Sequence, residues 1–151
     1  MKELTLPTLS LEKQLQFENL DFTLIKFKLK DAIEGEAWST KKCNNIELYY
    51  KRFLILNYLF PEERIVPTKD IDTFWHYHIL DTRHYIKTTK QIFGKYLHHY
   101  PYFGIFGKED KKNLEDAFQK TIQLYEEVFH EPLHLRSARC VSTCAGRCAS
   151  K

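Results

Sequence analysis

Residues 70–104 read DIDTFWHYHILDTRHYIKTTKQIFGKYLHHYPYFG, and this stretch determines both the predicted fold class and the candidate site. It contains five of the seven histidines in the chain. Its apolar residues recur at intervals of three and four, the spacing that places side chains on one face of an α-helix. We therefore predict a helix that begins after Pro67-Thr68 and runs to Phe93, with Gly94 ending it or marking a kink. The face that it should bury carries Ile71, Phe74, Trp75, His78, Thr82, Tyr85, Ile86 and Thr89.

Three other segments also favour helices. The most regular period of apolar residues runs from about Glu109 to His130, and another helix follows the N-cap candidate Ser39 and ends before Pro61. Residues 22–33 alternate like a strand but have no partner strand or hairpin turn, so we assign them to a helix. The predicted fold is all-α: a single compact helical bundle of four to six helices over residues 1–134, followed by a short, flexible, cysteine-containing tail over residues 135–151.

The composition is that of an ordinary globular protein, with 43% hydrophobic and 28% charged residues. No run approaches the roughly 20 apolar residues of a membrane helix, and the N-terminal segment lacks the features of a signal peptide. We therefore expect a cytoplasmic protein without a membrane partner. The net charge is +3, but residues 135–151 alone carry four basic and no acidic residues, so the body is nearly neutral. A nucleic-acid partner is not expected, because its binding needs a basic patch on the folded domain.

Asp72 and His76 are four residues apart, so their side chains can meet on one helix. Asp72 could orient His76 as a general base, which is the one catalytic role that we assign. Alternatively both could bind one divalent metal together with His98 or His99 and a thiolate from the tail. A surface ion pair of little consequence is the third interpretation.

Two other histidines of the stretch are assigned no function. We expect His78 to be a core imidazole that bonds to a carbonyl or a tyrosine hydroxyl, and His84 to be exposed. Because alternate residues of a helix point in different directions, His76 and His78 belong to separate sites.

The tail ends in RCVSTCAGRCASK and spaces Cys140, Cys144 and Cys148 four residues apart. In a reducing compartment such thiols are more typical of a metal site or of reactive cysteines than of disulfides. Three thiolates suit Cu(I), and with a further ligand from His134 or a domain histidine they suit Zn. The tail could instead be the part that a modifying enzyme or an unknown protein partner recognises.

Several residues of the opening stretch resemble the signature of the glycine-rich domain-containing protein-like family. They are Asp72, Trp75, His76, Ile79, Leu80, Thr82, Tyr85, Gly94, His98, His99 and Pro101. The resemblance implies that family's fold and a site of Asp72, His76, His98 and His99, but no reaction. This chain departs from the pattern in having Thr88 and Thr89 where a cysteine is common, and in lacking the glycine-rich segment.

The sequence thus predicts a small helical protein that binds a transition metal, Zn or Cu(I), or does thiol chemistry. The metal ligands would come from Asp72, His76, His98, His99, Cys140, Cys144 and Cys148. A non-catalytic interaction or regulatory module and a folded leader with a modified tail are the alternatives. An enzyme is less favoured, since no nucleophile, phosphate loop or pair of catalytic carboxylates stands out.

Overall fold

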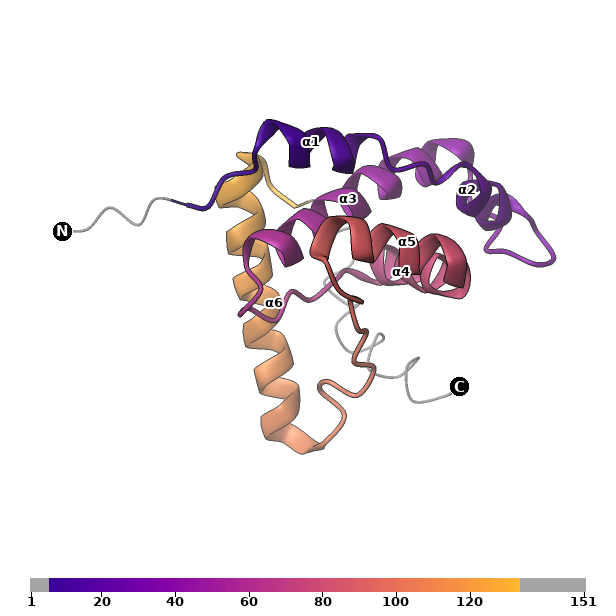
Figure 1. The fold of residues 1–151 in the computed structure, drawn as a ribbon. Coiled ribbons are helices and arrows are strands. Elements are labelled where there is room, and N and C mark those ends of the chain that lie inside the picture. Colours follow the sequence, from indigo (N-terminus) through magenta and orange to yellow (C-terminus); the bar gives the residue numbers. More distant parts are fainter. Residues whose placement is uncertain (1–5, 134–151) are drawn as a thin grey trace.

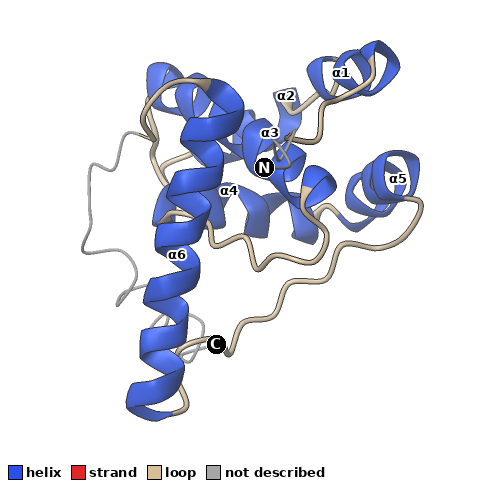
Figure 2. Cartoon of the chain, turned by 90° about the vertical axis from the view of Figure 1, so that its left-hand side faces the viewer, coloured by secondary structure: helices blue, strands red, loops and turns tan. Residues whose placement is uncertain are grey.

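A computed structural model describes residues 6–133, and within this range the protein is helical and contains no strand (Figures 1 and 2). The prediction of an all-α fold is confirmed. The helices are α1 (Leu11–Glu18), α2 (Thr23–Lys30), α3 (Thr40–Leu59), α4 (Lys69–Leu80), α5 (Thr82–Phe93) and α6 (Gly107–Phe129).

Helix α3 is the centre of the core and packs against α1, α2, α4 and α6. The Ser39 side chain accepts a hydrogen bond from the Lys42 N–H and caps the start of the helix, and Pro61 follows its end. Tyr50 on α3 is fully buried and lies against Phe22 and Phe74, with ring centroids 5.4 and 4.9 Å away. Aromatic rings from three elements therefore fill the middle of the protein.

The predicted helix over residues 69–93 is two helices, because the chain breaks at Asp81. The Asp81 carboxylate accepts a hydrogen bond from the His84 N–H and caps α5. On α5, Tyr85 and Thr89 are buried as predicted, together with Thr88 and Ile92, whereas Thr82 and Ile86 are exposed. The prediction of one continuous helix is therefore wrong, but within its predicted buried face only Thr82 and Ile86 are misplaced.

The other predicted helices are present, and one helix was missed. Residues 22–33 contain α2, and residues 109–130 contain most of α6. The helix α1 was not predicted, although Ser10 caps it by accepting a hydrogen bond from the Lys13 N–H. Its apolar residues are few and only Phe17 is buried, so its apolar period is weak.

Residues 94–106 form the connection that carries the two adjacent histidines from α5 to α6. Gly94 ends α5 in the left-handed conformation with a φ of 69°. At the other end of the connection the Asp110 carboxylate accepts hydrogen bonds from the Gly104 and Phe106 N–H groups. Helix α6 extends beyond the other helices, and the connection descends to its far end (Figures 1 and 2).

A Gly104→Ala variant is expected to be less stable than a Gly107→Ala variant by about 1–3 kcal/mol. Both glycines have a φ near 90°, so alanine adds similar backbone strain at either position. Only at Gly104 would the new Cβ meet another side chain, with Leu114 Cδ2 2.5 Å away, whereas Gly107 has nothing within 4 Å. Urea unfolding of the two variants measures the difference, and equal losses would contradict the packing account.

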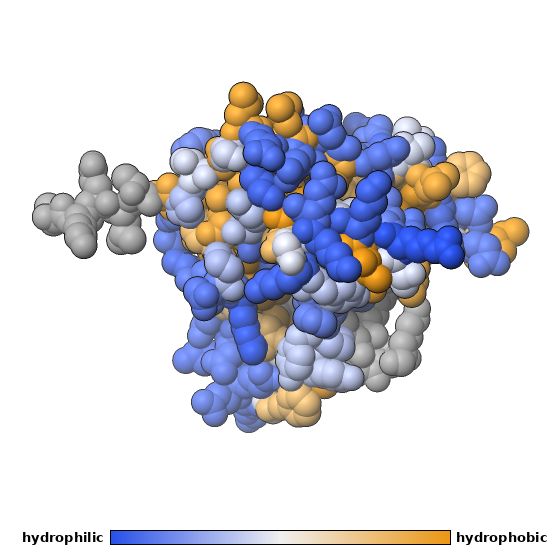
Figure 3. All heavy atoms as spheres, viewed as in Figure 1, coloured by the Kyte–Doolittle hydropathy of each residue, from blue (hydrophilic) through white to orange (hydrophobic). Residues whose placement is uncertain are grey.

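The surface in the view of Figure 3 is mainly hydrophilic, with hydrophobic side chains above α1 and at the end where α2 lies. Leu11 on α1 and Leu24 and Phe27 on α2 are more than 70% exposed. None of the six helices between residues 6 and 133 is long and apolar enough to cross a membrane.

Candidate metal centre

The first part of the candidate site is the N-terminal half of α4. Thr68 caps this helix, and Asp72 in its first turn is favoured there by the helix dipole. Asp72 is buried, and His76 lies one turn further along with a half-exposed side chain. Asp72 Oδ2 lies 3.8 Å from His76 Nδ1. This is longer than a hydrogen bond, so a general base at His76 oriented by Asp72 stays a prediction.

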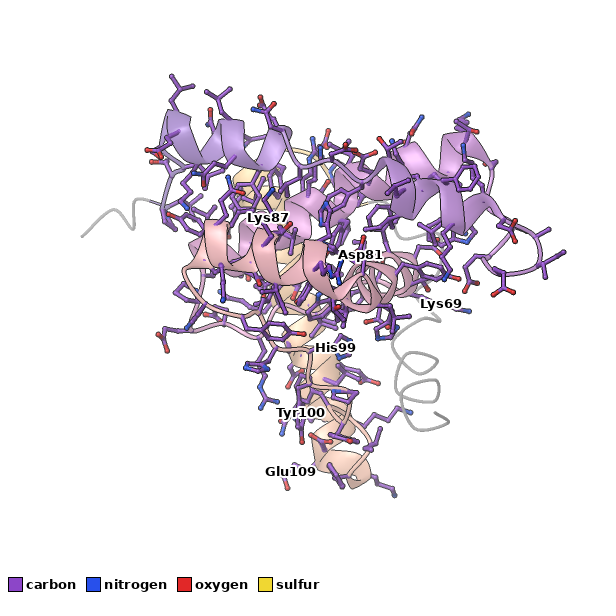
Figure 4. All side chains as sticks on the ribbon, turned by 45° about the vertical axis from the view of Figure 1, so that its right-hand side comes forward. Lys69, Asp81, Lys87, His99, Tyr100 and Glu109 are labelled. Atoms are coloured by element: carbon purple, nitrogen blue, oxygen red, sulfur yellow. The ribbon has the colours of Figure 1, made fainter. Side chains whose placement is uncertain are left out.

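The second part is His99, which the connection after α5 brings to α4. Its Nε2 lies 3.0 Å from Asp72 Oδ1 and 3.1 Å from His76 Nε2. Its ring packs on Trp75, with ring centroids 4.4 Å apart. In Figure 4 His99 lies on the connection just below α4 and α5, and Tyr100 lies further down the same connection. The structure therefore brings His99 to Asp72 and His76, which precede it by 27 and 23 residues in the sequence.

A buried tyrosine holds the connection in this place. The Tyr85 hydroxyl donates a hydrogen bond to the Leu97 carbonyl at 2.5 Å and accepts one from the Trp75 indole N–H at 3.0 Å. Burial raises the pKa of Tyr85 well above its usual value, so the hydroxyl keeps its proton and can donate. Trp75 and Tyr85 thus fix the backbone two residues before His99.

The geometry of the three side chains suits one metal ion. A neutral imidazole nitrogen has a single in-plane bonding direction, yet His99 Nε2 has two polar atoms within 3.1 Å. A cation between the three residues would take one donor atom from each. Donor atoms bound to a tetrahedral zinc ion at about 2.0–2.1 Å lie roughly 3.3 Å apart. The two distances from His99 Nε2 are close to this value, and all three donor atoms lie within 4.8 Å of one another. Within the described part of the chain, Asp72, His76 and His99 are the group whose donor atoms could hold a metal.

The other predicted ligands are not part of this group or lie outside the described residues. His98 is exposed, and its ring packs on Tyr96 with centroids 4.8 Å apart. His99, not His98, completes the cluster; the sequence alone did not decide between these two histidines. Cys140, Cys144 and Cys148 all lie beyond residue 133, so the structure gives them no place relative to the cluster.

A second polar cluster occupies the core on the other side of α4. His78 is fully buried, as predicted, and its Nδ1 lies 2.6 Å from the Tyr50 hydroxyl. Its Nε2 lies 2.7 Å from Nδ1 of His84, whose Nε2 lies 2.8 Å from the Asp21 carbonyl oxygen. The expectation that His84 is exposed is wrong: it is half-buried, and its Nδ1 also lies 3.2 Å from the Thr88 hydroxyl.

The Asp21 carbonyl oxygen, at one end of this series of hydrogen bonds, determines the direction of every bond in the series. A carbonyl oxygen only accepts, so His84 Nε2 donates to Asp21, and in the neutral ring His84 Nδ1 must accept. His78 then donates through Nε2 and accepts at Nδ1 from the Tyr50 hydroxyl. Burial lowers the pKa of His78 to about 3, with a smaller contribution from His84, which keeps it neutral. This cluster is a satisfied core network and offers no open ligand position.

A pocket of about 230 Å³ opens beside Asp72 and His99. No pattern in the sequence predicts this pocket, because its walls come from five separate segments. Its lining residues are Asn57, residues 63–67, Asp72, Trp75, residues 98–101, Phe103 and Leu114. A metal at the cluster would therefore lie at the edge of a cavity that can take a small molecule.

Fold and site together define an all-helical protein with a candidate centre of two histidines and one aspartate. The chain belongs to the UCP032817-like family, which it matches over residues 16–129, well over half of its length. This match overturns the expected membership of the glycine-rich domain-containing protein-like family, which is not found. The short signature of residues 72–101 was too local to separate the two families. The search of curated proteins and the search of solved structures each gave no match.

Proposed function

We propose that the protein binds one divalent transition-metal ion, Zn²⁺, through Asp72, His76 and His99. The observation that carries the proposal is the position of His99 Nε2, within 3.1 Å of a donor atom from each of the other two residues. Three protein ligands leave a coordination position open, which is the arrangement of reactive rather than purely structural zinc sites. A carboxylate and two imidazoles favour Zn²⁺ over Cu(I), which prefers sulfur ligands.

The position of the cluster also supports this function. The Asp72 carboxyl group is buried, and a cation bound against it would be a charge partner within the protein. His76 is half-exposed, so an ion has a route from solvent. The adjoining pocket would give a bound ion access to a ligand.

Protein purified without a polyhistidine tag and dialysed against zinc is expected to hold about one equivalent of metal by mass spectrometric elemental analysis. The matched control replaces Cys140, Cys144 and Cys148 with serine, which removes all three tail thiols and leaves the cluster intact. We expect this variant to hold the same single equivalent, because the three cluster residues supply the binding site. Loss of metal from the serine variant would show that the tail completes the site, and a metal-free parent protein would refute the proposal.

An interaction module is the second candidate, favoured by the exposed apolar face of α2. Leu24 and Phe27 are 77% and 71% exposed, and Ile33 in the following turn is 90% exposed. Large apolar side chains that gather at one end of a protein are typical of a contact with a protein partner. A modified tail is a separate hypothesis, and intact-mass measurement of residues 134–151 from the native host would test it.

A further inference from the structure

The pocket beside the candidate metal centre has one strongly polar end and an apolar body. Trp75, Pro67, Phe103 and Leu114 supply much of its apolar wall. Asp72 and His99 lie at the side where the metal would bind, and Arg64 is the only arginine among the described residues that line the pocket. The pocket therefore offers a cation, an apolar surface and a metal position to the same small molecule.

The Arg64 guanidinium is held in place by aromatic rings. Its central carbon lies 4.4 Å from the ring centroid of Phe103 and 5.9 Å from that of Tyr100. Stacking of this kind leaves the N–H groups at the edge of the guanidinium plane free to donate. Among residues 6–133 no ion pair joins Arg64 to a carboxylate. An oriented guanidinium without a protein carboxylate is well suited to bind the carboxylate of a ligand.

The size and charge of the pocket restrict that ligand. An apolar cavity of about 150 Å³ is large enough to bind benzene. A volume of about 230 Å³ thus fits one ring, or a short branched chain, that bears a carboxylate. Glu63 also lines the pocket and would repel a second negative charge, so a dianion such as a dicarboxylate or phosphate is disfavoured.

We infer that this pocket binds a small monocarboxylate with an aromatic or branched apolar body, whose carboxylate pairs with Arg64 and whose body packs on Trp75 and Phe103. The inference deepens the proposed function and rests on it in one respect: the ligand would lie beside the metal held by Asp72, His76 and His99. The Arg64 contact itself does not require the metal.

Titration of zinc-loaded protein with benzoate, followed by the NMR signals of the Trp75 indole, tests the inference. Arg64→Gln is expected to weaken benzoate binding about tenfold or more, because it removes a charge-assisted hydrogen bond. Arg83→Gln is the matched control: Arg83 is exposed on α5 and does not line the pocket, so binding should be unchanged. Benzamide, which has the same ring but no charge, should bind the parent protein as weakly as benzoate binds Arg64→Gln.

Metal content, measured on the same samples, separates this inference from the proposed function. Arg64→Gln should keep its full equivalent of zinc while losing benzoate. Zinc binding without any benzoate binding, or equal binding of benzoate by Arg64→Gln and Arg83→Gln, would overturn the inference and leave the metal site standing. Arg64-dependent benzoate binding by a protein that takes up no zinc would support the pocket and refute the metal site.

Discussion

A His99→Ala variant is expected to lose zinc affinity by more than about 100-fold. Loss of a residue that only supports a ligand already costs 10–100-fold in affinity, and His99 is a proposed ligand itself. It also contributes the nitrogen that lies nearest to both other donors. Isothermal titration with zinc measures the affinity directly.

The same loss should be visible in stability. At a free zinc concentration of about 100 times Kd, the parent protein gains about 2.7 kcal/mol of unfolding free energy. A variant that binds about 100-fold more weakly gains only about 0.4 kcal/mol at that concentration. Thermal unfolding with and without zinc should therefore show a shift in the parent protein that nearly vanishes in His99→Ala.

His98→Ala is the matched control, because it removes the same side chain from the adjacent residue. His98 is exposed and contacts the Tyr96 ring, outside the cluster. We expect its zinc affinity and zinc-dependent thermal shift to match those of the parent protein. Equal losses in the two variants would mean that the His98-His99 pair acts as a unit. A loss in His98→Ala alone would mean that His98, and not His99, is the metal ligand.

The sequence predicted the helices because their apolar residues are periodic, but it did not predict the break at Asp81. The apolar period continues through Ile79 and Leu80 and resumes at Tyr85, so a single helix fits the pattern. In an unbroken helix His84 would lie about 240° around the axis from His78, too far to meet it. The break brings the two rings within 2.7 Å, and only the capping preference of Asp81 pointed to it.

The candidate site, too, could be predicted only where its residues are close in sequence. Asp72 and His76 could be paired from their spacing, because both lie on one helix. The choice between His98 and His99 depends on the path of a connection that has no regular period, fixed by Tyr85 and Leu97. Arg64 was not predicted at all, since its role comes from the Phe103 and Tyr100 rings that surround it.

A His78→Leu variant is expected to lose about 2–4 kcal/mol of unfolding free energy at pH 7.5, and to lose most of the acid sensitivity of the core. The substitution leaves the buried Tyr50 hydroxyl without its acceptor and leaves His84 Nδ1 with only the Thr88 hydroxyl as a donor. In the parent protein the pKa of His78 is about 3, below the ordinary 6.5 of the unfolded chain. The contribution of neutral His78 to the free energy of unfolding is therefore fully present above pH 6.5. It declines as the pH falls toward 3, and about 2 kcal/mol of it is lost at pH 5. Urea unfolding at pH 7.5 and pH 5 measures both effects.

The double variant Tyr50→Phe/His78→Leu tests whether the hydrogen bond causes the loss at neutral pH. Burial raises the pKa of Tyr50, so its hydroxyl keeps the proton that it donates to His78 Nδ1. Removing a hydroxyl that has already lost its acceptor takes away a buried unpaired group, so the double variant should be at least as stable as His78→Leu. Additive losses would contradict the network, because the effects of independent residues add and those of hydrogen-bonded partners do not.

Acid would disrupt the same hydrogen bond. A proton on His78 Nδ1 would place two donors against each other, since the Tyr50 hydroxyl already points there. An acid sensitivity that is unchanged in His78→Leu would therefore assign the effect of pH to the other histidines and remove His78 from the account.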